Sequence, residues 1–598
     1  MPNISQKYQE FLSNTKKTFS LIIVFSFVIN LLMLTGPLFM LQIYDRVLTS
    51  GSVETLVALS ILVVVLYLFM GALELVRTRI LARIANGFDA VCGASAFLHA
   101  VRQRIQPSPV GAGSAPASDA APAREPVRDL DRVRQFLSST GVAPLFDIPW
   151  LPAYHVIVYL IHPILSIVAI TGTAVLFLLA LAADRVARPL ARASGAIAAE
   201  RHAMAGAAAR NAEAVAGMGM EQALGQAWEK ASDRYLDKNL STNDAIGASG
   251  VVSKVFRLFI QSAMLGVGAY LALIGEISAG AIIAASIIMA RGLQPVESAV
   301  QNWRNLIDAH AAYRRMRTVM DAPEEALPGP DLPTPERTLS VSHLTVTPPR
   351  ASTATLTDVS FSAAAGEAVG VIGHSGSGKS TLARALVGVW RPTEGTVLLD
   401  GTPLSQFGLE ARSTFVGYLP QDVELFAGSV RDNIARFRDD ASDDEVIGAA
   451  QAAGCHEMIA ALPQGYGTSV GEAGHTLSAG QRQRIALARA LYGAPFLVVL
   501  DEPNSNLDGH GDTALHDAIK GAKARGAVVV VVAHRPSALS AADTLCLIEN
   551  GQLAEFGPRD EVLRKVMRRH ASTSPAEPVG DGRADESAPA GARTDGTP

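Results

Sequence analysis

The sequence of 598 residues contains little cysteine and few charged side chains. Its three cysteines, Cys92, Cys455 and Cys546, are too widely scattered for a disulfide framework or a metal site. Charged residues make up only 18% and the net charge is −5, so the charge balance does not indicate a nucleic-acid partner. Hydrophobic residues make up 49%, which is unusual for a soluble enzyme and indicates a protein that lies partly in a membrane.

A cleavable signal peptide is not expected either. Lys7, Lys16 and Lys17 precede a long apolar run, but the run is too long for a signal peptide and does not end in a small-residue cleavage site. Only about 18 residues come before this run, which leaves no room there for a peptidase domain. We therefore expect the run to be retained as a first membrane span.

Six apolar stretches have roughly the length needed to cross a bilayer. They are predicted to pair as three hairpins: 19–41 with 56–73, 149–161 with 164–181, and 251–274 with 277–290. The first short link is predicted to contain Asp45, Arg46 and Ser52. The sixth stretch is short by hydropathy, which fits a helix that lines a polar pathway.

Basic residues give the orientation of these spans. They concentrate in two long polar links, whereas the short links offer only Arg46. The links contain Arg77, Arg79, Arg83, Arg102 and Arg104, and then Arg185, Arg188, Arg192, Arg201 and Arg210. By the positive-inside bias, both termini and both long links are predicted to be cytoplasmic, with the links forming long helices.

Composition also sets the domain limits. A membrane domain is predicted over 1–320, with a disordered insert at 107–126 that is rich in Ala, Pro, Gly and Ser. Pro and acidic residues mark a linker over 321–336, and alternating strand and helix patterns predict an α/β domain over 337–570. The remaining residues, 571–598, have the composition of a disordered tail.

A phosphate-binding loop lies in the α/β domain, between a predicted strand at 368–372 and a predicted helix at 381–389. Its residues are Gly373, His374, Ser375, Gly376, Ser377, Gly378, Lys379 and Ser380. The glycines allow backbone N–H groups to surround a phosphate at a helix N-terminus. Lys379 is expected to reach the β- and γ-phosphates of ATP, and Ser380 is expected to bind Mg²⁺.

A second motif makes a chance match improbable. The apolar run 496–500 predicts a buried parallel strand that ends in Asp501 and Glu502. Asp501 is expected to hold Mg²⁺, and Glu502 is expected to polarise the attacking water.

Between these motifs, Leu477-Ser478-Ala479-Gly480-Gln481 leads into a predicted helix, and here the sequence resembles the ATP-binding-cassette family. The resemblance implies that Ser478, Gly480 and Gln481 of one copy close over the nucleotide of another, with Thr381 also near the nucleotide. It further implies that Gln421 senses magnesium and contacts the membrane domain. By the same resemblance, Asp508 would cross the dimer interface, and His534 would bridge the γ-phosphate and Glu502.

Two positions depart from the family pattern. Ala479 stands where glycine is common, which adds a methyl group near the phosphate. Pro348, in a first strand predicted to include 343–349, stands where most members offer an aromatic ring to adenine. The first change is expected to slow hydrolysis, and the second is expected to weaken recognition of the base.

Several longer phrases resemble the permease/ATPase of type I secretion systems, of the alkaline-protease-exporter kind. They are Gly36-Pro37-Leu38-Phe39-Met40-Leu41-Gln42-Ile43-Tyr44-Asp45-Arg46-Val47, Phe146-Asp147-Ile148-Pro149-Trp150-Leu151-Pro152, Met218-Gly219-Met220 and the run from Leu500 to Asp508. The resemblance implies a homodimer in the bacterial inner membrane, in contact with lipid, a periplasmic adaptor and an outer-membrane channel. Its cargo would be an unfolded protein with an uncleaved C-terminal signal.

Two features of the sequence allow a second interpretation. Asp147 and Trp150 flank the start of a span, so either residue could serve as an interfacial anchor or a helix-end contact. The same six-span architecture with an ATPase domain also serves exporters of lipids or small molecules, because function depends on the site rather than the fold.

Overall fold

The computed structural model describes residues 4–105, 126–139, 141–321, 332–349, 351–533 and 536–573. The chain forms two compact units, Met1–Pro323 and Glu324–Pro598. The predicted insert lies outside the described residues except for Pro126, which is buried at the start of helix α5 rather than in a loop. The predicted tail also lies outside them, except that helix α21 continues to Thr573.

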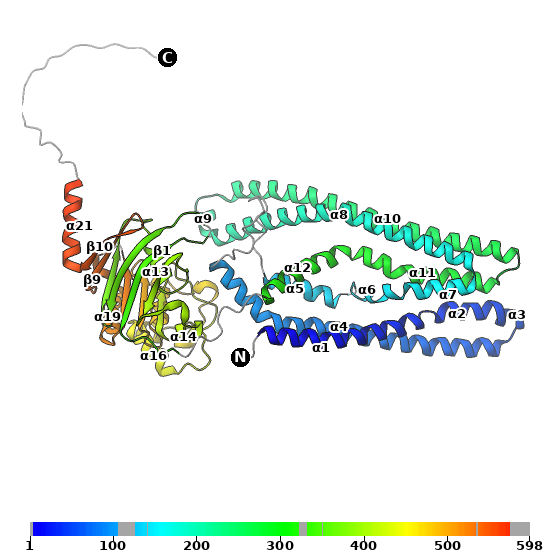
Figure 1. The fold of residues 1–598 in the computed structure, drawn as a ribbon, viewed down its shortest axis with the longest axis horizontal. Helices are drawn as coiled ribbons and strands as arrows, with labels where there is room; N and C mark the ends of the chain where they lie inside the picture. The colour runs from blue at the N-terminus through cyan, green and yellow to red at the C-terminus, as the bar shows by residue number, and fades with distance from the viewer. Residues whose placement is uncertain are drawn as a thin grey trace, which may run out of the picture. The chain divides into compact units, whose positions relative to one another are not determined.

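Short links join the helices of the first unit, and its described residues contain no strand (Figure 1). Six helical segments in the described ranges are long and apolar enough to cross a membrane, which confirms the predicted number of spans. The first span comprises α1 (Ile4–Leu32), α2 (Thr35–Gln42), the π-helical turn η1 (Ile43–Val47) and α3 (Leu48–Ser50). The others are formed by α4 (Val53–Ile105), α6 (Ala143–Asp147) with α7 (Leu151–Ile161), α8 (Pro163–Arg210), α10 (Glu221–Leu273) and α11 (Ala279–Gln301). The shorter α5 (Pro126–Ser138), α9 (Ala212–Gly217) and α12 (Trp303–Asp321) complete this unit.

The first short link differs from the prediction. Asp45 and Arg46 belong to the π-helical turn and not to a loop. A helix satisfies its own backbone hydrogen bonds, so it can continue beyond its apolar stretch into polar sequence. It ends at Gly51, whose positive φ of 66° suits a glycine at a helix C-terminus. Ser52 then begins α4 by accepting a hydrogen bond from the Thr55 N–H at 3.2 Å.

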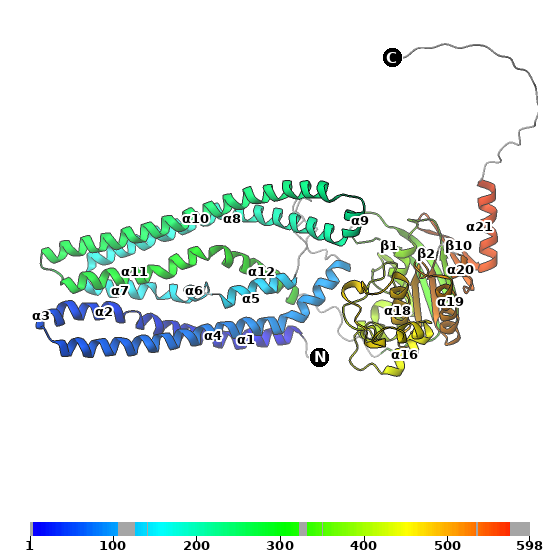
Figure 2. The ribbon, with the colours of Figure 1, turned by 180° about the vertical axis from the view of Figure 1, so that it is seen from behind.

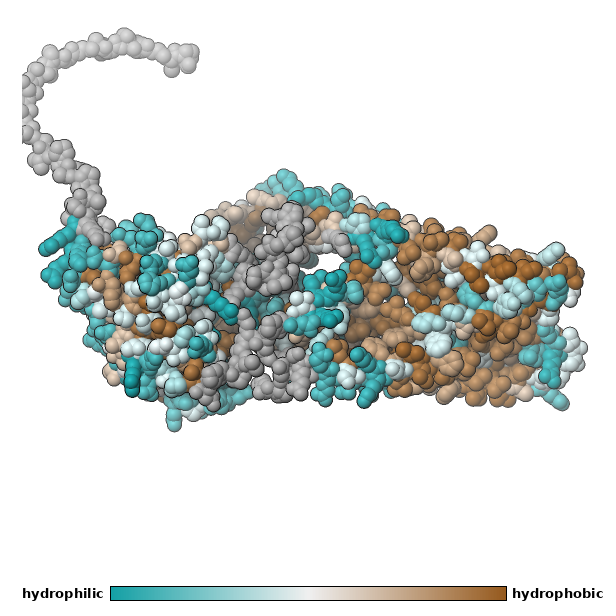
Figure 3. All heavy atoms as spheres, viewed as in Figure 1, coloured by the Kyte–Doolittle hydropathy of each residue, from teal (hydrophilic) through white to brown (hydrophobic). Residues whose placement is uncertain are grey.

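The spans differ in how deeply they are buried within the unit. Helices α8 and α10 run side by side along their length (Figures 1 and 2). In the most apolar stretch of α11, 56% of the residues are buried in the protein, whereas none are buried in that of α4. Figure 3 shows hydrophobic side chains forming a band over the spans, with hydrophilic side chains on either side of it. This surface suits a bilayer around the band.

A buried polar network joins three of the spans. Asp147 accepts hydrogen bonds from Arg77 Nη1 and Asn30 Nδ2, both at 2.9 Å, and Arg77 also donates to Ser26 at 3.2 Å. Tyr154 OH donates to the backbone oxygen of Asn30 at 3.0 Å. Asp147, the last residue of α6, therefore makes a helix-end contact, one of the two interpretations that the sequence left open.

The second unit contains two sheets within its described residues. A four-stranded antiparallel sheet has the order β2 (Leu356–Ala364), β1 (Thr338–Val346), β4 (Glu394–Leu399), β5 (Thr402–Pro403). A six-stranded sheet has the order β10 (Gln552–Pro558), β9 (Thr544–Glu549), β3 (Ala368–Ile372), β8 (Val528–Val532), β7 (Leu497–Asp501), β6 (Val416–Leu419). All its neighbouring strands are parallel except β10 and β9. The parallel strands place the loops that follow them at one edge of the sheet.

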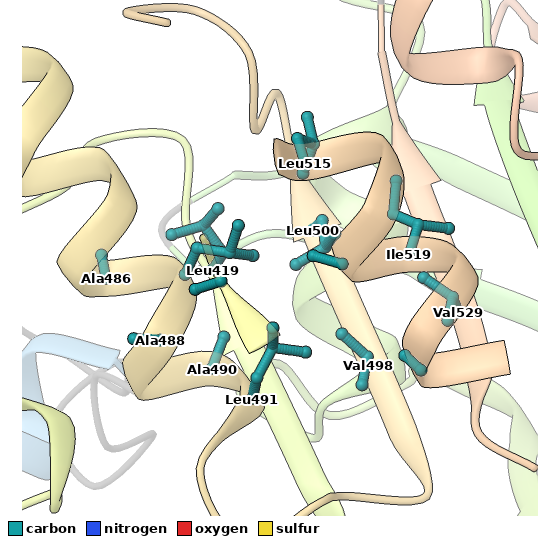
Figure 4. Packing of buried hydrophobic residues seen from close by; sticks show 14 of the residues in the cluster. Leu419, Ala486, Ala488, Ala490, Leu491, Val498, Leu500, Leu515, Ile519 and Val529 are labelled. Carbon is teal, nitrogen blue, oxygen red and sulfur yellow. The ribbon is translucent and has the colours of Figure 1, made fainter. Parts of the chain in front are cut away.

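Helices α13, α18 and α19 contact strands of the six-stranded sheet. The helices in the described part of this unit are α13 (Lys379–Leu386), α14 (Leu409–Phe415), α15 (Val430–Ile434), α16 (Asp443–Ala452), α17 (His456–Ala460), α18 (Ala479–Leu491), α19 (Gly509–Ala524), α20 (Pro536–Leu539) and α21 (Arg559–Thr573). In Figure 4, Ala486 and Leu491 of α18 lie in one cluster with Leu419 of β6 and Leu500 of β7. This core anchors the helix that carries the Ser478 motif.

The first strand of the unit also ends earlier than predicted. Strand β1 stops at Val346, so Thr347, Pro348 and Pro349 lie beyond it. Proline has no N–H to donate to a neighbouring strand, which explains the end of the ladder. The Pro348 backbone oxygen instead accepts from the Ala351 N–H at 3.0 Å.

Candidate nucleotide-binding site

The phosphate-binding loop runs from the end of β3 to the start of α13. Gly373 has φ 154°, and a Cβ there would lie 2.2 Å from the backbone oxygen of Ile548. Only glycine fits this close approach. His374, Ser375 and Gly376 are exposed at the tip of the loop, so their backbone N–H groups lie where a phosphate can reach them.

Lys379 opens α13, and its side chain is 5% exposed. Its Nζ donates to the backbone oxygens of Gly373 at 3.0 Å and His374 at 2.8 Å. Burial lowers the pKa of this amine, while the nearby carboxylates of Glu502 and Asp501 oppose that shift. The ammonium group therefore already lies inside the loop that is built to surround a phosphate.

Asp501 ends β7 and is fully buried. Its Oδ1 accepts from Ser380 Oγ at 3.3 Å, whereas its buried Oδ2 has no hydrogen-bond partner among the described residues. Burial raises the pKa of this carboxyl group, and the hydrogen bond from Ser380 and the nearby cations partly oppose the shift. Mg²⁺ prefers oxygen ligands such as a hydroxyl group and a carboxylate oxygen that has no hydrogen-bond partner. Ser380 and Asp501 therefore fit a magnesium ion.

Glu502 follows directly, with an unusual positive φ of 50°. Its N–H donates to the Val532 backbone oxygen of β8 at 2.9 Å, which fixes the residue beside the next strand. Such a conformation persists where surrounding contacts enforce it, and it occurs often at functional sites. His534, which follows β8, lies outside the described residues, so its predicted contact with Glu502 stays a prediction.

Two other predicted residues lie near this edge of the sheet. Thr381 is buried in the first turn of α13. Gln421 is exposed, two residues beyond the end of β6, and β6 is the neighbour of β7. The exposed position leaves the Gln421 side chain free to turn toward a ligand or another surface.

The signature residues form a separate cluster at the start of α18. Ser478 Oγ accepts from the Gln481 N–H at 3.2 Å, and Gln481 Oε1 accepts from the Ser478 N–H at 2.9 Å. This reciprocal capping box sets where the helix begins. Ser478 and Ala479 are exposed, so the start of the helix is available to another molecule. The methyl group of Ala479, at the position where glycine is common in the family, therefore lies on an exposed surface.

Asp508 caps the next helix, α19, by accepting from the Gly511 N–H at 2.8 Å. That hydrogen bond holds the pKa of its carboxyl group below the ordinary value. Arg484 of α18 lies 3.6 Å from Asp508 Oδ1, and a Cβ on Gly480 would lie 3.1 Å from the Asn506 backbone oxygen. The signature helix and the segment 503–508 are thus in direct contact.

Two residues in this contact were not predicted from the sequence. Gln483 is 1% exposed and donates to the Pro503 backbone oxygen at 3.0 Å. Asn504 is also buried, and its Nδ2 has no hydrogen-bond partner among the described residues. A glutamine on the otherwise apolar buried face of α18 was the available signal for the first, because buried polar side chains are normally hydrogen-bonded.

Two family models match the chain, one in each unit. The model of the ABC transporter ATPase family matches residues 356–505. The model of the ABC transporter transmembrane region matches residues 19–107 and 127–295, so its match is interrupted at the predicted insert.

Relatives match across both units. The type I secretion system ATP-binding protein PrsD of Rhizobium meliloti (strain 1021) is 45% identical over 91% of this chain and 92% of its own length. The cyclolysin secretion/processing ATP-binding protein CyaB of Bordetella pertussis is 30% identical over 91% of this chain and 75% of its own. A solved bacterial Atm1-family ABC exporter with ATP bound is similar in fold, with TM-score 0.78 and 22% identity over 94% of this chain and 99% of that chain.

Proposed function

Because the chain belongs to the type I secretion ATP-binding proteins of the ABC transporter family, we propose that it uses ATP hydrolysis to secrete a protein. One observation carries this proposal. A single chain joins six apolar spans to an ATPase site in which Ser380 and Asp501 lie side by side, and its likeness to the Rhizobium protein extends over both units. Either unit alone would not couple ATP to transport.

ATP and Mg²⁺ are the proposed cofactors. Lys379 and the loop N–H groups hold the phosphates, and Ser380, Asp501 and Gln421 hold the magnesium ion. When bound, the ion neutralises negative charge that develops on the phosphates. Glu502 polarises the attacking water as a general base, and His534 bridges the γ-phosphate and Glu502. The vacant Asp501 Oδ2 and the position of Lys379 support this assignment.

The active form is proposed to be a homodimer. The exposed Ser478, with Gly480 and Gln481, faces away from the chain's own core, so it suits the nucleotide of a second copy. A helix N-terminus favours an anion, because its first N–H groups and the helix dipole point toward it. The Ser478 hydroxyl can donate its proton to a phosphate oxygen while its oxygen still accepts the capping hydrogen bond from the Gln481 N–H. Asp508 lies at the same surface.

The orientation follows from the arginine-rich links. Both termini are proposed to be cytoplasmic, with the protein in the bacterial inner membrane. Partners would be a periplasmic adaptor and an outer-membrane channel, and the cargo would be an unfolded protein with an uncleaved C-terminal signal. The names of the relatives, a type I secretion protein and a cyclolysin secretion protein, support a protein cargo.

The test is secretion in a bacterial host that lacks its own type I system. The chain is expressed with the adaptor and channel encoded nearest to its gene, and with a tagged candidate cargo from the same locus. We expect the cargo in the medium only when all three components and an intact Glu502 are present. Removal of the last residues of the cargo should abolish secretion.

The main alternative predicts a different outcome. If the chain exports lipids or small molecules, its ATPase activity in vesicles should rise with a lipid or drug and should need no adaptor. Secretion of no cargo, together with such stimulation, would refute the proposal.

A further inference from the structure

One residue of the first span contacts the sixth span, although the two spans are far apart in the sequence. Asp45, in the π-helical turn η1, accepts from Ser278 Oγ at 2.5 Å through Oδ2 and from the Gly280 N–H at 3.0 Å through Oδ1. These donors are 233 and 235 residues away in sequence. Asp45 therefore ties the end of the first span to the beginning of α11.

The donors belong to the N-terminus of α11, where backbone N–H groups lack partners within the helix. Ser278 is the N-cap, and its hydroxyl oxygen accepts from the Ala281 N–H at 3.1 Å. Asp45 adds a negative charge at the positive end of the helix dipole. A carboxylate from one span thus completes the cap of another.

Gly280 shows how closely the two spans meet. A Cβ on this residue would lie 2.6 Å from Asp45 Oδ1 and 2.8 Å from its Cγ. Real Cβ atoms do not approach other atoms so closely, so any larger residue must displace Asp45. The glycine and the aspartate form one fitted contact.

This contact differs from the Asp147 network in its exposure to water. Asp147 and Arg77 are buried, whereas Asp45 and Ser278 are exposed at the ends of their spans. Water can replace exposed hydrogen bonds readily, but it cannot reach buried ones without opening the bundle. The Asp45 contact is thus suited to break and re-form, while the Asp147 network is suited to persist.

We propose that Asp45 is a releasable latch, which holds α11 against the first span and keeps the extracytoplasmic end of the export pathway closed. The inference rests on the orientation given under the proposed function. The span that it holds, α11, has a larger buried share than any other span in the described residues. Release of cargo requires this end to open, and the latch is a polar contact that opening exchanges for water. The π-helical turn aims Asp45 at its partner, as such turns often do at functional positions.

The first test locks the latch in the full-length dimer in lipid vesicles. Asp45→Cys and Ser278→Cys are combined and joined with the shortest bifunctional methanethiosulfonate, because the two side-chain ends meet in the structure. We expect efficient cross-linking without nucleotide, loss of ATP-driven export, retained ATP binding, and recovery after reduction. Each single cysteine variant, treated identically, is the control. Failure to cross-link, or export at the uncross-linked rate while locked, would overturn the proposal.

The second test breaks the latch and needs no cargo. Ala279→Cys, an exposed position between the two donors that leaves both hydrogen bonds to Asp45 in place, is labelled with a membrane-impermeant maleimide from the extracytoplasmic side. We expect ATP to raise the labelling rate, and Gly280→Ala to raise it about tenfold without ATP, a change equivalent to roughly 1.4 kcal/mol. Gly266→Ala, where a Cβ meets nothing within 4 Å, is the matched control and should have no effect.

The outcomes separate the latch from the proposed function. ATP-raised labelling in a protein that secretes no cargo and whose ATPase activity rises with a lipid or drug would refute protein export but support the latch. Labelling that ATP and Gly280→Ala leave unchanged, in a protein with normal ATPase activity, would refute the latch alone.

Discussion

The two units of this chain use polar residues in opposite ways. In the ATPase unit, polar groups gather at one edge of a buried parallel sheet, where Asp501 keeps an oxygen without a partner among the described residues. In the membrane unit, Asp147 accepts hydrogen bonds from two neighbouring helices. An unpaired buried group is costly unless a ligand completes it, whereas a paired group mainly fixes structure. The difference indicates where a cofactor binds and where helices are joined.

The largest effect is expected at Glu502. Glu502→Gln keeps the shape of the side chain but cannot accept a proton, so hydrolysis should fall by roughly 10² to 10⁴-fold while ATP still binds. Steady-state hydrolysis and nucleotide binding by the purified dimer measure both. Glu549→Gln, at the end of strand β9 of the same sheet, is a control that should retain activity. Hydrolysis near the parent rate would remove Glu502 from the assigned role.

The second largest effect is expected in the membrane unit, on stability rather than on chemistry. Arg77→Ala leaves the buried Asp147 carboxylate without its cation, a change that typically costs about 3 to 5 kcal/mol. Thermal unfolding in detergent should therefore occur at a markedly lower temperature. Arg79→Ala, at an exposed position of the same helix, should change little. If the two variants unfold at the same temperature, the proposed structural role of the polar residues in the membrane unit is contradicted.

The sequence predicted the ATPase unit better than the membrane unit, because short motifs specify the first and contacts between distant residues specify the second. The strands before Gly373 and Glu502 were predicted within one residue, because a phosphate-binding motif constrains residue type and spacing together, whereas helix α13 begins two residues earlier than predicted, at Lys379. Helix ends in the membrane unit were less predictable. Asp45 was placed in a link because it is polar, but its partner at Gly280 is 235 residues away and only the fold brings them together. The buried Gln483 and Asn504 escaped prediction for the same reason.

A smaller effect is expected at Pro348, which lies beyond β1 where a stacking ring is common in the family. Stacking a base on an aromatic ring is worth roughly 1 to 3 kcal/mol in nucleic-acid binding, so its loss should weaken recognition of adenine. We expect GTP to be hydrolysed with an efficiency within about tenfold of ATP, since tenfold corresponds to roughly 1.4 kcal/mol. Pro348→Tyr should tighten ATP binding. A hundredfold preference for ATP in the parent would show that another group recognises the base.

The smallest effect is expected from the insert, which interrupts the match to the transmembrane family model. Its composition offers little surface to bury, so deletion of Ser108 to Arg124 should leave dimer assembly and ATPase activity nearly unchanged. Size-exclusion chromatography and steady-state hydrolysis check this. Normal assembly with a large loss of export would instead make the insert a docking element for cargo or adaptor.

Coupling between the two units is tested most directly by counting ATP hydrolysed and cargo moved in the same preparation. Inside-out vesicles that contain the dimer and the adaptor are given ATP and a fluorescent, unfolded cargo with its C-terminal signal. The parent protein should accumulate protease-protected cargo in proportion to ATP hydrolysed, and Glu502→Gln should accumulate almost none although ATP binds. Equal accumulation of cargo by the two proteins would contradict ATP-driven protein export. So would sustained ATP hydrolysis by the parent protein with no accumulation of cargo and at a rate that cargo does not change.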